Sequence, residues 1–532
     1  MSQEMCSYYA DGCGLPKFDG YQECILHCPK NKIIRDNKLH FAELNSFYLE
    51  LCKHIVNQIF KGTTETTFFS KSIVTSILKR ESLHPDIQNN IQHIRERLQN
   101  KTIVLNHIAF PKYDSREPFD YMPILQQLGK IHFNYCQFYV GRIALPSTEC
   151  FFQDCEFFEH WSLYDYPVLK NIDNVVYQQC RFHNSVSAAG TENDDERFQL
   201  THQQFNNCHF DKELAFEYID AKEPIFANSD ELRSNIKKLK VYHSNFEKGF
   251  VLNDYIIESA YFENSVFDEK FEFKYNRVNA FEIDDCNFKK IADFFESTFE
   301  KFKIHKSIFD NFTGFELCQF GKEIDPKNRD YIALFEYVTF SNFVNFRNTH
   351  FYSGLDIDNI NLKDSPNFLN TEIGFSNTTR ETFRIVKNSF DKIGNHIDAN
   401  HFFALEMRKH KEDLLKEDGK KTEKLVFWFN ESISEFGQNY LRPICIFVAL
   451  SLLFYLLSIG YEREWLYIFN EPVNHILGSI AGFFNGLAKS LLPFDSKLLK
   501  KGMEFISLWF YIAFSVLMWQ IIVAVKRHTK RE

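Results

Sequence analysis

The residues of this chain that are best suited to chemistry are cysteines and a histidine near its start. Cys6, Cys13, Cys24 and His27 are separated by six, ten and two residues, and Cys28 follows directly. Thiolate and imidazole are donors that Zn²⁺ prefers, and a site with four protein donors is structural, not catalytic. We therefore predict a structural zinc site with the ligands Cys6, Cys13, Cys24 and His27. Cys28 is an alternative to His27, and reduced cysteines without a metal are the other interpretation.

No catalytic set stands out in the rest of the sequence. The chain has no GxxxxGK[ST] phosphate-binding loop, no GxSxG nucleophile motif and no HExxH metalloprotease motif. Its 19 histidines do not cluster beyond His396, His401 and His410, which we interpret as surface residues. We therefore expect that the protein is not an enzyme.

A phenylalanine-rich repeat occupies the middle of the chain, which has 59 Phe among 532 residues. Hexapeptides in this part begin and end with a large apolar residue, as in FNYCQF (133–138), FNNCHF (205–210) and FENSVF (262–267). A small or β-branched residue stands two positions before the final one. These residues are Cys136, Cys155, Cys180, Cys208, Ser244, Ser265, Cys286, Ser307, Cys318, Val338, Thr349 and Ile360.

A spacing of five between the large residues fits neither an α-helix nor an alternating strand. It fits a coil with four short sides, in which the large residue and the small one point inward. The pattern resembles the pentapeptide-repeat family, and the resemblance implies a right-handed quadrilateral β-helix. Gaps near 185–200 and 222–236 look like loops. We interpret the repeat cysteines as small buried side chains, not as metal ligands or redox sensors, and an irregular Phe-rich β protein is the alternative fold.

Helical spacing of apolar residues appears on both sides of the repeat. Phe47 and Leu51 belong to such a pattern before it, and Phe383, Val386 and Phe390 follow it. The stretches 380–411 and SEFGQNYLRPI (434–444) resemble the linkers of bacterial pentapeptide-repeat proteins that continue into a membrane pore. We divide the chain into a zinc knuckle (1–30), a helical cap (31–129), the β-helix (130–375), a helical linker (376–441) and a membrane pore module (442–532).

The pore module contains two apolar segments without charges, 443–460 and 505–525. Crossing a bilayer takes about 20 helical residues, so both are predicted transmembrane helices. The segment 470–495 between them is rich in glycine and carries polar residues, which favours a re-entrant or pore helix shielded from lipid. A plain two-helix anchor with an interfacial helix is the alternative. Because one hairpin cannot enclose a pore, we expect a cyclic homo-oligomer and prefer a tetramer. No TVGYG-like filter indicates potassium selectivity.

Charges near the two spans predict the topology. Arg442 precedes the first span, and Lys526, Arg527, Lys530 and Arg531 follow the second. Positive residues favour the cytoplasmic side, so both termini should be cytoplasmic. The N-terminal segment lacks the basic and apolar regions of a secretory signal, which also predicts reduced cysteines. We expect a multi-pass protein of a bacterial inner membrane.

This order of modules resembles that of bacterial antiphage-defence membrane effectors of the Hailong type. The resemblance implies an ion channel held closed by a single-stranded DNA oligomer, which a partner nucleotidyltransferase makes. The lysines that could contact phosphate are Lys237, Lys238 and Lys240, and then Lys301, Lys303 and Lys306, although solvated surface lysines are the simpler interpretation.

We predict an oligomeric ion channel gated by its cytoplasmic repeat domain. The alternative is a membrane-tethered interaction scaffold that conducts no ions. A DNA-mimicking solenoid is a third possibility, which the net charge of −10 favours and the membrane module opposes. The same charge argues against a general nucleic-acid-binding protein.

Overall fold

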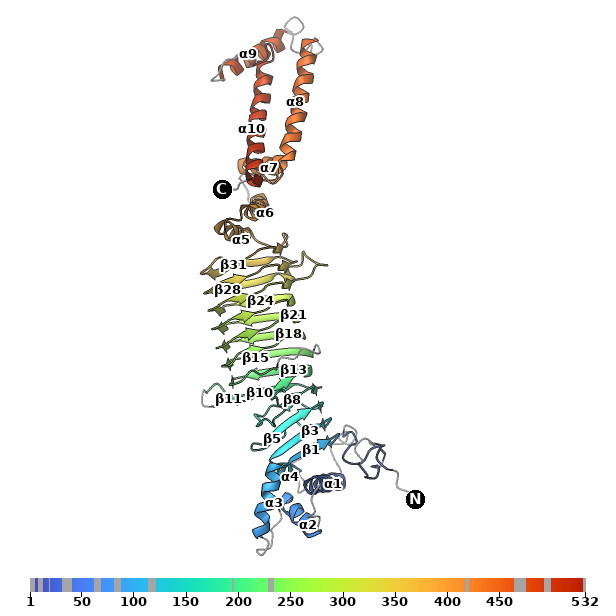
Figure 1. Cartoon of the computed structure of the whole chain (residues 1–532). Coiled ribbons are helices and arrows are strands. Elements are labelled where there is room, and N and C mark those ends of the chain that lie inside the picture. Colours follow the sequence, from blue (N-terminus) through green and yellow to red (C-terminus); the bar gives the residue numbers. More distant parts are fainter. Residues whose placement is uncertain are drawn as a thin grey trace. The chain divides into compact units, whose positions relative to one another are not determined.

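The computed structural model describes residues 5–7, 13–18, 20–30, 41–61, 68–80, 88–112, 121–193, 196–227, 234–416, 421–463, 475–491 and 499–529. The chain separates into two compact units, Met1–Asn377 and Thr378–Glu532. We call the first the repeat unit and the second the helical unit. Figure 1 shows that stacked strands dominate the repeat unit and that the helical unit contains α5 to α10.

The repeat unit contains a β-solenoid of about 11 turns, in which the strands pair in parallel. This confirms the predicted coil of stacked repeats. The first ladder contains β1 (Thr102–Asn106), β3 (Lys130–Asn134), β5 (Glu149–Gln153), β8 (Tyr177–Gln178) and β12 (Phe205–Asn206). A second short ladder contains β17 (Phe250–Val251), β20 (Phe271–Glu272), β23 (Ala292–Asp293), β26 (Thr313–Gly314) and β29 (Val344–Asn345).

The remaining strands form one large ladder that runs along the solenoid. Its long strands are β13 (His209–Glu217), β15 (Ser234–Tyr242), β18 (Tyr255–Glu263), β21 (Arg277–Asp284), β24 (Thr298–His305), β28 (Ala333–Phe340) and β31 (Leu355–Leu362). Its short strands are β2 (Ala109–Phe110), β4 (Gln137–Phe138), β6 (Glu156–Phe157), β7 (Trp161–Ser162), β9 (Arg181–Phe182), β10 (Val186–Ala189), β11 (Phe198–Leu200), β14 (Ile219–Ala221), β16 (Asn245–Phe246), β19 (Val266–Phe267), β22 (Asn287–Phe288), β25 (Ile308–Phe309), β27 (Gln319–Phe320), β30 (His350–Phe351) and β32 (Glu372–Ile373).

The strands begin earlier, and are interrupted less, than the hexapeptide pattern suggested. β1 lies within the range 31–129 that we assigned to a helical cap, yet it pairs in register with β3. Five residues are too few for their periodicity to separate a strand from a helix. β10 and β11 lie inside 185–200, where we expected a loop. Backbone pairing holds β10 between β7 and β13, although it lacks the large residue of the repeat.

Phenylalanine rings stack along the inside of the solenoid. Phe246, Phe267, Phe288 and Phe309 pair in register on successive coils. Their ring centroids are 5.0, 4.8 and 4.5 Å apart, with nearly parallel planes. These distances are close to the spacing of about 4.8 Å between neighbouring strands, so each ring contacts the same ring of the next coil. The predicted inward position of the large residue is confirmed, since these four side chains are buried.

The small residue of most repeats follows a sharp corner of the backbone. The residue before it adopts a positive φ, as at Asn264 (46°) and Asp285 (50°), a conformation uncommon outside glycine. The Ser265 hydroxyl accepts a hydrogen bond from the Ser244 backbone N–H at 3.2 Å and donates to the Glu263 carbonyl at 2.8 Å. The position therefore favours a small side chain, and a serine there also forms hydrogen bonds.

Cysteine satisfies the same requirement. The Cys318 thiol lies 3.0 Å from the Phe294 carbonyl oxygen, to which it donates. Burial raises the pKa of the Cys155 and Cys208 thiols well above the usual value, so these groups stay protonated and remain donors. Our interpretation of the repeat cysteines as small hydrophobic residues missed this hydrogen bonding.

Helices cover the first coil of the solenoid. They are α1 (Phe41–Phe60), α2 (Phe68–Leu78), α3 (Gln88–Asn100) and the short α4 (Met122–Leu125). The Gln58 side chain of α1 accepts a hydrogen bond from the Val104 backbone N–H at 2.9 Å and donates one to the Val104 carbonyl. Gln58 thus bonds to β1 as a neighbouring strand would. An uncovered strand edge invites pairing with other chains, and α1 protects this one.

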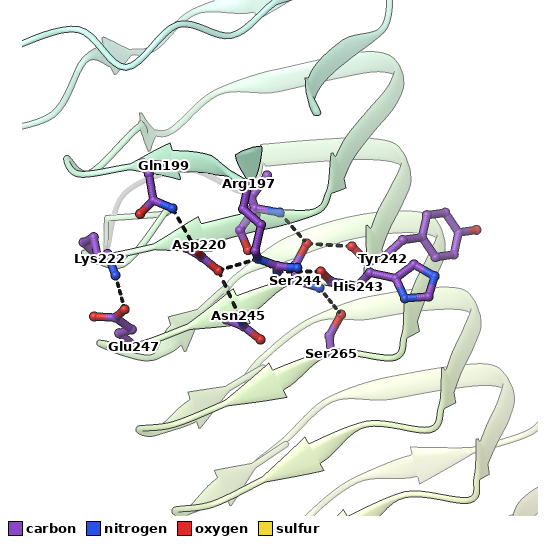
Figure 2. A network of polar contacts seen from close by, with 11 residues as sticks. Arg197, Gln199, Asp220, Lys222, Tyr242, His243, Ser244, Asn245, Glu247 and Ser265 are labelled. Atoms are coloured by element: carbon purple, nitrogen blue, oxygen red, sulfur yellow. Dashed lines mark hydrogen bonds and ion pairs between the residues drawn. The ribbon is translucent and has the colours of Figure 1, made fainter. Parts of the chain in front are cut away.

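A polar network joins three coils in the middle of the solenoid (Figure 2). Arg197 donates to an Asp220 carboxylate oxygen at 2.7 Å and to the His243 carbonyl at 2.6 Å. Gln199 and Asn245 also donate to Asp220, at 2.7 and 3.0 Å. The Arg197 and Asp220 side chains are only 10% and 15% exposed, so this pair is screened far less than a surface ion pair.

This network predicts a pH-dependent contribution to stability. Burial alone would raise the pKa of the Asp220 carboxyl, but hydrogen bonds from Arg197 and Gln199 outweigh burial and lower this pKa. A lowered pKa stabilises the fold above the unfolded-state value of about 3.9, and this stabilisation is lost as the pH falls through the folded-state value. We expect Asp220→Asn to lower the free energy of unfolding at pH 7 by about 1–3 kcal/mol, with a smaller effect at pH 3.

Thermal unfolding at a series of pH values measures this difference. Asp268→Asn is the control, because Asp268 forms a more exposed ion pair with Lys289, worth about 1 kcal/mol or less. Equal destabilisation by Asp220→Asn at pH 7 and pH 3 would show that its charge is not what matters.

The helical unit begins with a pair of packed helices, α5 (Arg380–Lys392) and α6 (His396–Lys416). Phe383, Val386 and Phe390 are buried, as the predicted helical spacing requires, and Phe390 stacks on Phe402 of α6 at 5.5 Å. The buried Glu406 carboxylate of α6 accepts a hydrogen bond from Lys387 of α5 at 2.9 Å. The unit continues with α7 (Lys421–Ser434), α8 (Leu441–Glu462), α9 (His475–Leu491) and α10 (Glu504–Thr529).

Candidate metal centre and membrane helices

The structure brings the four predicted metal ligands together. Cys6, Cys13, Cys24 and His27 present ligand atoms that all lie within 4.8 Å of one another. The Cys13 and Cys24 sulfurs are 3.5 Å apart, and the His27 Nδ1 lies 3.5 Å from the Cys6 sulfur and 3.4 Å from that of Cys24. These side chains come from three separate places in a short segment, which folds back to form one cluster.

Local backbone contacts create this cluster. An antiparallel bridge between Met5 and Pro16 places Cys6 beside the later part of the segment. The backbone N–H groups of His27 and Cys28 both donate to the Cys24 carbonyl, at 3.1 and 2.9 Å, which forms a tight turn. That turn gives the Cys-x2-His spacing its shape.

The cluster has the dimensions of a tetrahedral zinc site. Zn–S distances of about 2.3 Å and Zn–N distances of about 2.0–2.1 Å require ligand atoms roughly 3.5–3.8 Å apart. The closest pairs here, 3.4 to 3.5 Å apart, lie at the lower edge of this range. The Cys24 backbone N–H donates to the Cys6 sulfur at 3.2 Å, a contact that stabilises negative charge on a thiolate. Geometry and donor chemistry therefore both fit a metal ion held by these side chains.

Cys28, the alternative to His27, does not join the cluster. Its sulfur accepts a hydrogen bond from the Lys30 ammonium group at 3.4 Å, and Lys30 also donates to the Cys28 and Ile25 carbonyls. Burial raises the pKa of the Cys28 thiol, although the nearby Lys30 opposes this effect. Cys28 and Lys30 are both buried and help to hold the turn, which leaves His27 as the fourth ligand.

The metal-centre segment is attached to the first coil. The Leu26 carbonyl, next to His27, accepts a hydrogen bond from the Ala109 backbone N–H of β2 at 2.8 Å. Lys30 lies 5.4 Å from the centre of the Phe47 ring of α1. A metal ion at this point would stabilise the segment that lies against the start of the solenoid.

Two of the described helices are long and apolar enough to cross a membrane. α8 has a mean hydropathy of 2.3 and none of its apolar window is buried, while the corresponding values for α10 over Glu504–Arg527 are 2.1 and 17%. A core helix of a soluble protein would be mostly buried. Leu452 and Leu456 of α8 and Trp519 of α10 are 59, 63 and 65% exposed. Both predicted spans are thus present as continuous helices with largely uncovered apolar surfaces.

The two helices lie side by side as an antiparallel pair (Figure 1). Phe447 of α8 contacts Phe514 of α10, and Phe454 contacts Phe510, with ring centroids 5.0 and 4.9 Å apart. The hydroxyl groups of Ser451 and Ser515 donate to the carbonyls four residues earlier in their own helices, so neither is left unsatisfied in an apolar setting.

α9 contacts the beginning of α10 and the residues just before it. The Asn485 side chain accepts a hydrogen bond from the Phe505 backbone N–H at 2.9 Å and donates to the Gly502 carbonyl at 2.9 Å. Phe484 packs on Phe505 with centroids 4.9 Å apart. Asn485 thereby satisfies a backbone group in the first turn of α10.

Comparison of the chain with protein-family models, with curated proteins and with solved structures finds no match.

Polar groups at the other end of α10 were not singled out by the sequence patterns. Gln520 accepts a hydrogen bond from the Ser434 hydroxyl at 2.9 Å and donates to Asn430 at 2.9 Å, and both partners belong to α7. The Arg527 carbonyl accepts a hydrogen bond from Asn400 of α6 at 2.9 Å. A single amide within an apolar span is a signal for a specific partner, and this signal could have identified Gln520.

The lysine runs that we considered for phosphate binding are partly neutralised. Lys238 and Lys240 both pair with Glu213, at 3.4 and 2.8 Å. Lys303 pairs with Glu282 at 2.8 Å. These ion pairs favour the interpretation of the runs as solvated surface lysines.

Proposed function

We propose that the chain is a membrane protein in which α8 and α10 cross the lipid bilayer while the solenoid stays in water. The observation that carries this proposal is the exposure of α8, in which only Pro443 and Gly460 are buried. Monomeric soluble proteins rarely expose a continuous apolar surface larger than a few hundred Å². In a bilayer this exposure is not unfavourable, because the acyl chains of the lipid are as apolar as these side chains.

The proposal extends to an oligomeric ion channel. A single hairpin of α8 and α10 cannot surround an aqueous path, so conduction requires a ring of identical chains, for which we prefer a tetramer. The uncovered surfaces of both helices supply area for contacts between copies as well as for lipid. The solenoid, as a right-handed quadrilateral pentapeptide-repeat β-helix, would be the cytoplasmic regulatory domain, and no enzymatic step belongs to this proposal.

The orientation follows from charge. Arg442 lies at the start of α8, and Lys526 and Arg527 lie at the end of α10. The positive-inside rule then puts both termini in the cytoplasm, across a bacterial inner membrane. Closure by a single-stranded DNA oligomer from a partner nucleotidyltransferase, as part of antiphage defence, is the regulatory part of the proposal. It is supported only by the resemblance of the modular order to Hailong-type effectors.

The ion proposed for the metal centre is zinc in a structural role. The support is the donor set of three thiolates and one imidazole, which is soft and borderline in character. Such a site leaves no open coordination position for a substrate. Its proposed task is to fold the first 30 residues against the start of the solenoid.

Ion flux through purified protein reconstituted in liposomes tests the channel proposal. We expect salt-loaded vesicles that contain the protein to release ions faster than empty vesicles. Phe454→Ala removes an aromatic contact between α8 and α10. It should therefore alter the rate at which the vesicles release ions. Protein that is inserted and oligomeric but passes no ions would favour the scaffold, and the channel proposal would then be wrong.

A further inference from the structure

The helix α7 exposes four large apolar side chains, while its packed face is largely polar. Leu425, Val426, Trp428 and Phe429 are 55, 57, 52 and 48% exposed. A helix on the surface of a water-soluble protein shows the opposite distribution, with its apolar stripe against the core. Four large apolar residues within five positions therefore require contact with lipid or with another protein surface.

The opposite face of α7 is occupied by the rest of the helical unit. Phe427 contacts the His410 ring of α6 at 4.9 Å, and Glu431 forms an ion pair with Lys411. Asn430 and Ser434 bond to Gln520 of α10. At 100° per residue, Phe427, Glu431 and Ser434 fall on one side of the helix and Leu425 and Phe429 on the other. The exposed apolar face is thus a true second face and not an extension of the packed one.

The contact with Gln520 gives the depth of α7 along the span. Gln520 precedes Arg527 by seven residues, which corresponds to about 10 Å of helix. The polar layer of a bilayer is roughly 5–8 Å thick on each side. If Arg527 lies at the charged outer edge of this layer, α7 lies where the headgroups meet the acyl chains. Trp is enriched at this level in membrane proteins, because its ring is apolar and its N–H is polar.

We propose that α7 lies in the plane of the bilayer interface and inserts Leu425, Val426, Trp428 and Phe429 between the lipid headgroups. The inference rests on the proposed membrane insertion of α8 and α10. Interfacial helices bind in this way, with an apolar face about 5–10 Å deep. The lipid surface continues along α8, where Leu441, Ile444 and Val448 are also exposed. The depth of α7 given by its contact with Gln520 favours lipid over a second copy of the chain as the cover of α7.

The arrangement assigns a role to the bonds between α7 and α10. Because α7 is held at the interface by its apolar face and joined to α10 through Gln520, a change in the surrounding headgroups would act on the end of the span.

Quenching of tryptophan fluorescence in nanodiscs tests this inference. The full chain is inserted into discs whose lipids carry bromine near the headgroup, and wild type is compared with Trp428→Phe and Trp519→Phe. We expect each substitution to remove part of the quenched signal. The double variant Trp428→Phe with Phe427→Trp moves the indole to the packed face. We expect that it does not restore the quenched signal that Trp428→Phe removes.

The outcomes separate the inference from the proposed function. Trp519→Phe could remove part of the quenched signal while Trp428→Phe removes none. This result would overturn the interfacial role of α7 and leave membrane insertion intact. The absence of quenching at both positions would overturn insertion itself. If Trp428 stays unquenched and a Trp428→Cys variant forms a disulfide between two chains, a second copy covers α7. Circular dichroism of each variant confirms that its helices are retained.

Discussion

Replacing Cys24 by serine is expected to abolish metal binding by the N-terminal segment. Wild-type protein purified without added metal should contain about one zinc ion per chain, and Cys24→Ser close to none, because a structural site requires all four donors. The Cys24 sulfur contacts two other members of the cluster, Cys13 and His27. Binding of zinc to small domains supplies about 10–16 kcal/mol of apparent free energy, so its loss should unfold this segment. Elemental analysis measures the zinc content, and proteolysis within residues 1–30 reports the unfolding.

Cys28→Ser is the matched control for this substitution. The Cys28 sulfur belongs to the same turn, but it contacts Lys30 and not the cluster. The variant should keep its zinc and resist proteolysis as wild type does. If Cys28→Ser lost zinc and His27→Ala kept it, Cys28 would be the fourth ligand. Wild-type protein without any metal, even after refolding with zinc, would show that the cysteines are simply reduced.

Truncating a ring inside the solenoid is expected to destabilise the stack of coils strongly. Phe288 is buried and stacks on Phe267 and Phe309 at 4.8 and 4.5 Å. Replacement of a buried Phe by Ala costs about 3–5 kcal/mol, since it removes apolar contacts and leaves a cavity. In a solenoid each coil contacts only its neighbours, so a defect in the middle weakens the coupling of both halves. Denaturation followed by circular dichroism should show a lower midpoint or a split transition for Phe288→Ala.

Phe343→Ala provides the comparison for the same loss of atoms at the surface. Phe343 is 38% exposed and contacts the Phe312 ring only at 6.2 Å. We expect it to change the midpoint much less than Phe288→Ala. Similar effects of the two substitutions would mean that the aromatic column is not what holds the coils together.

The repeat could be predicted because one spacing recurs on successive coils. Phe267 and Phe288 occupy the same place in register, and a column of identical positions leaves the same pattern in each hexapeptide. The corner hydrogen bonds could not be predicted, because the Ser265 hydroxyl contacts a backbone group on another coil. Sequence periodicity reports which residues point inward and does not report what they bond to.

The ends of the solenoid were harder to predict for a related reason. β1 begins the stack although it lacks the hexapeptide pattern, since it needs only a partner strand on one side and the Gln58 side chain on the other. The metal ligands were predictable from residue type, but the choice between His27 and Cys28 depended on the turn and on Lys30.

In the helical unit, length and hydropathy sufficed to predict α8 and α10. They did not reveal that the apolar face of α7 is exposed. The sequence of α7 alone shows no preference between packing against protein and packing against lipid. Only the contacts of Phe427 and Asn430 with α6 and α10 identify which face is covered.

Membrane flotation after an alkaline carbonate wash tests the central claim most directly. Carbonate releases peripheral proteins and aggregates do not float, so only protein that crosses the bilayer remains with the lipid. With α8 and α10 as spanning helices, the full chain should float with the washed membranes and leave them only in detergent. Recovery of the chain in the carbonate supernatant as a monodisperse protein would contradict membrane insertion.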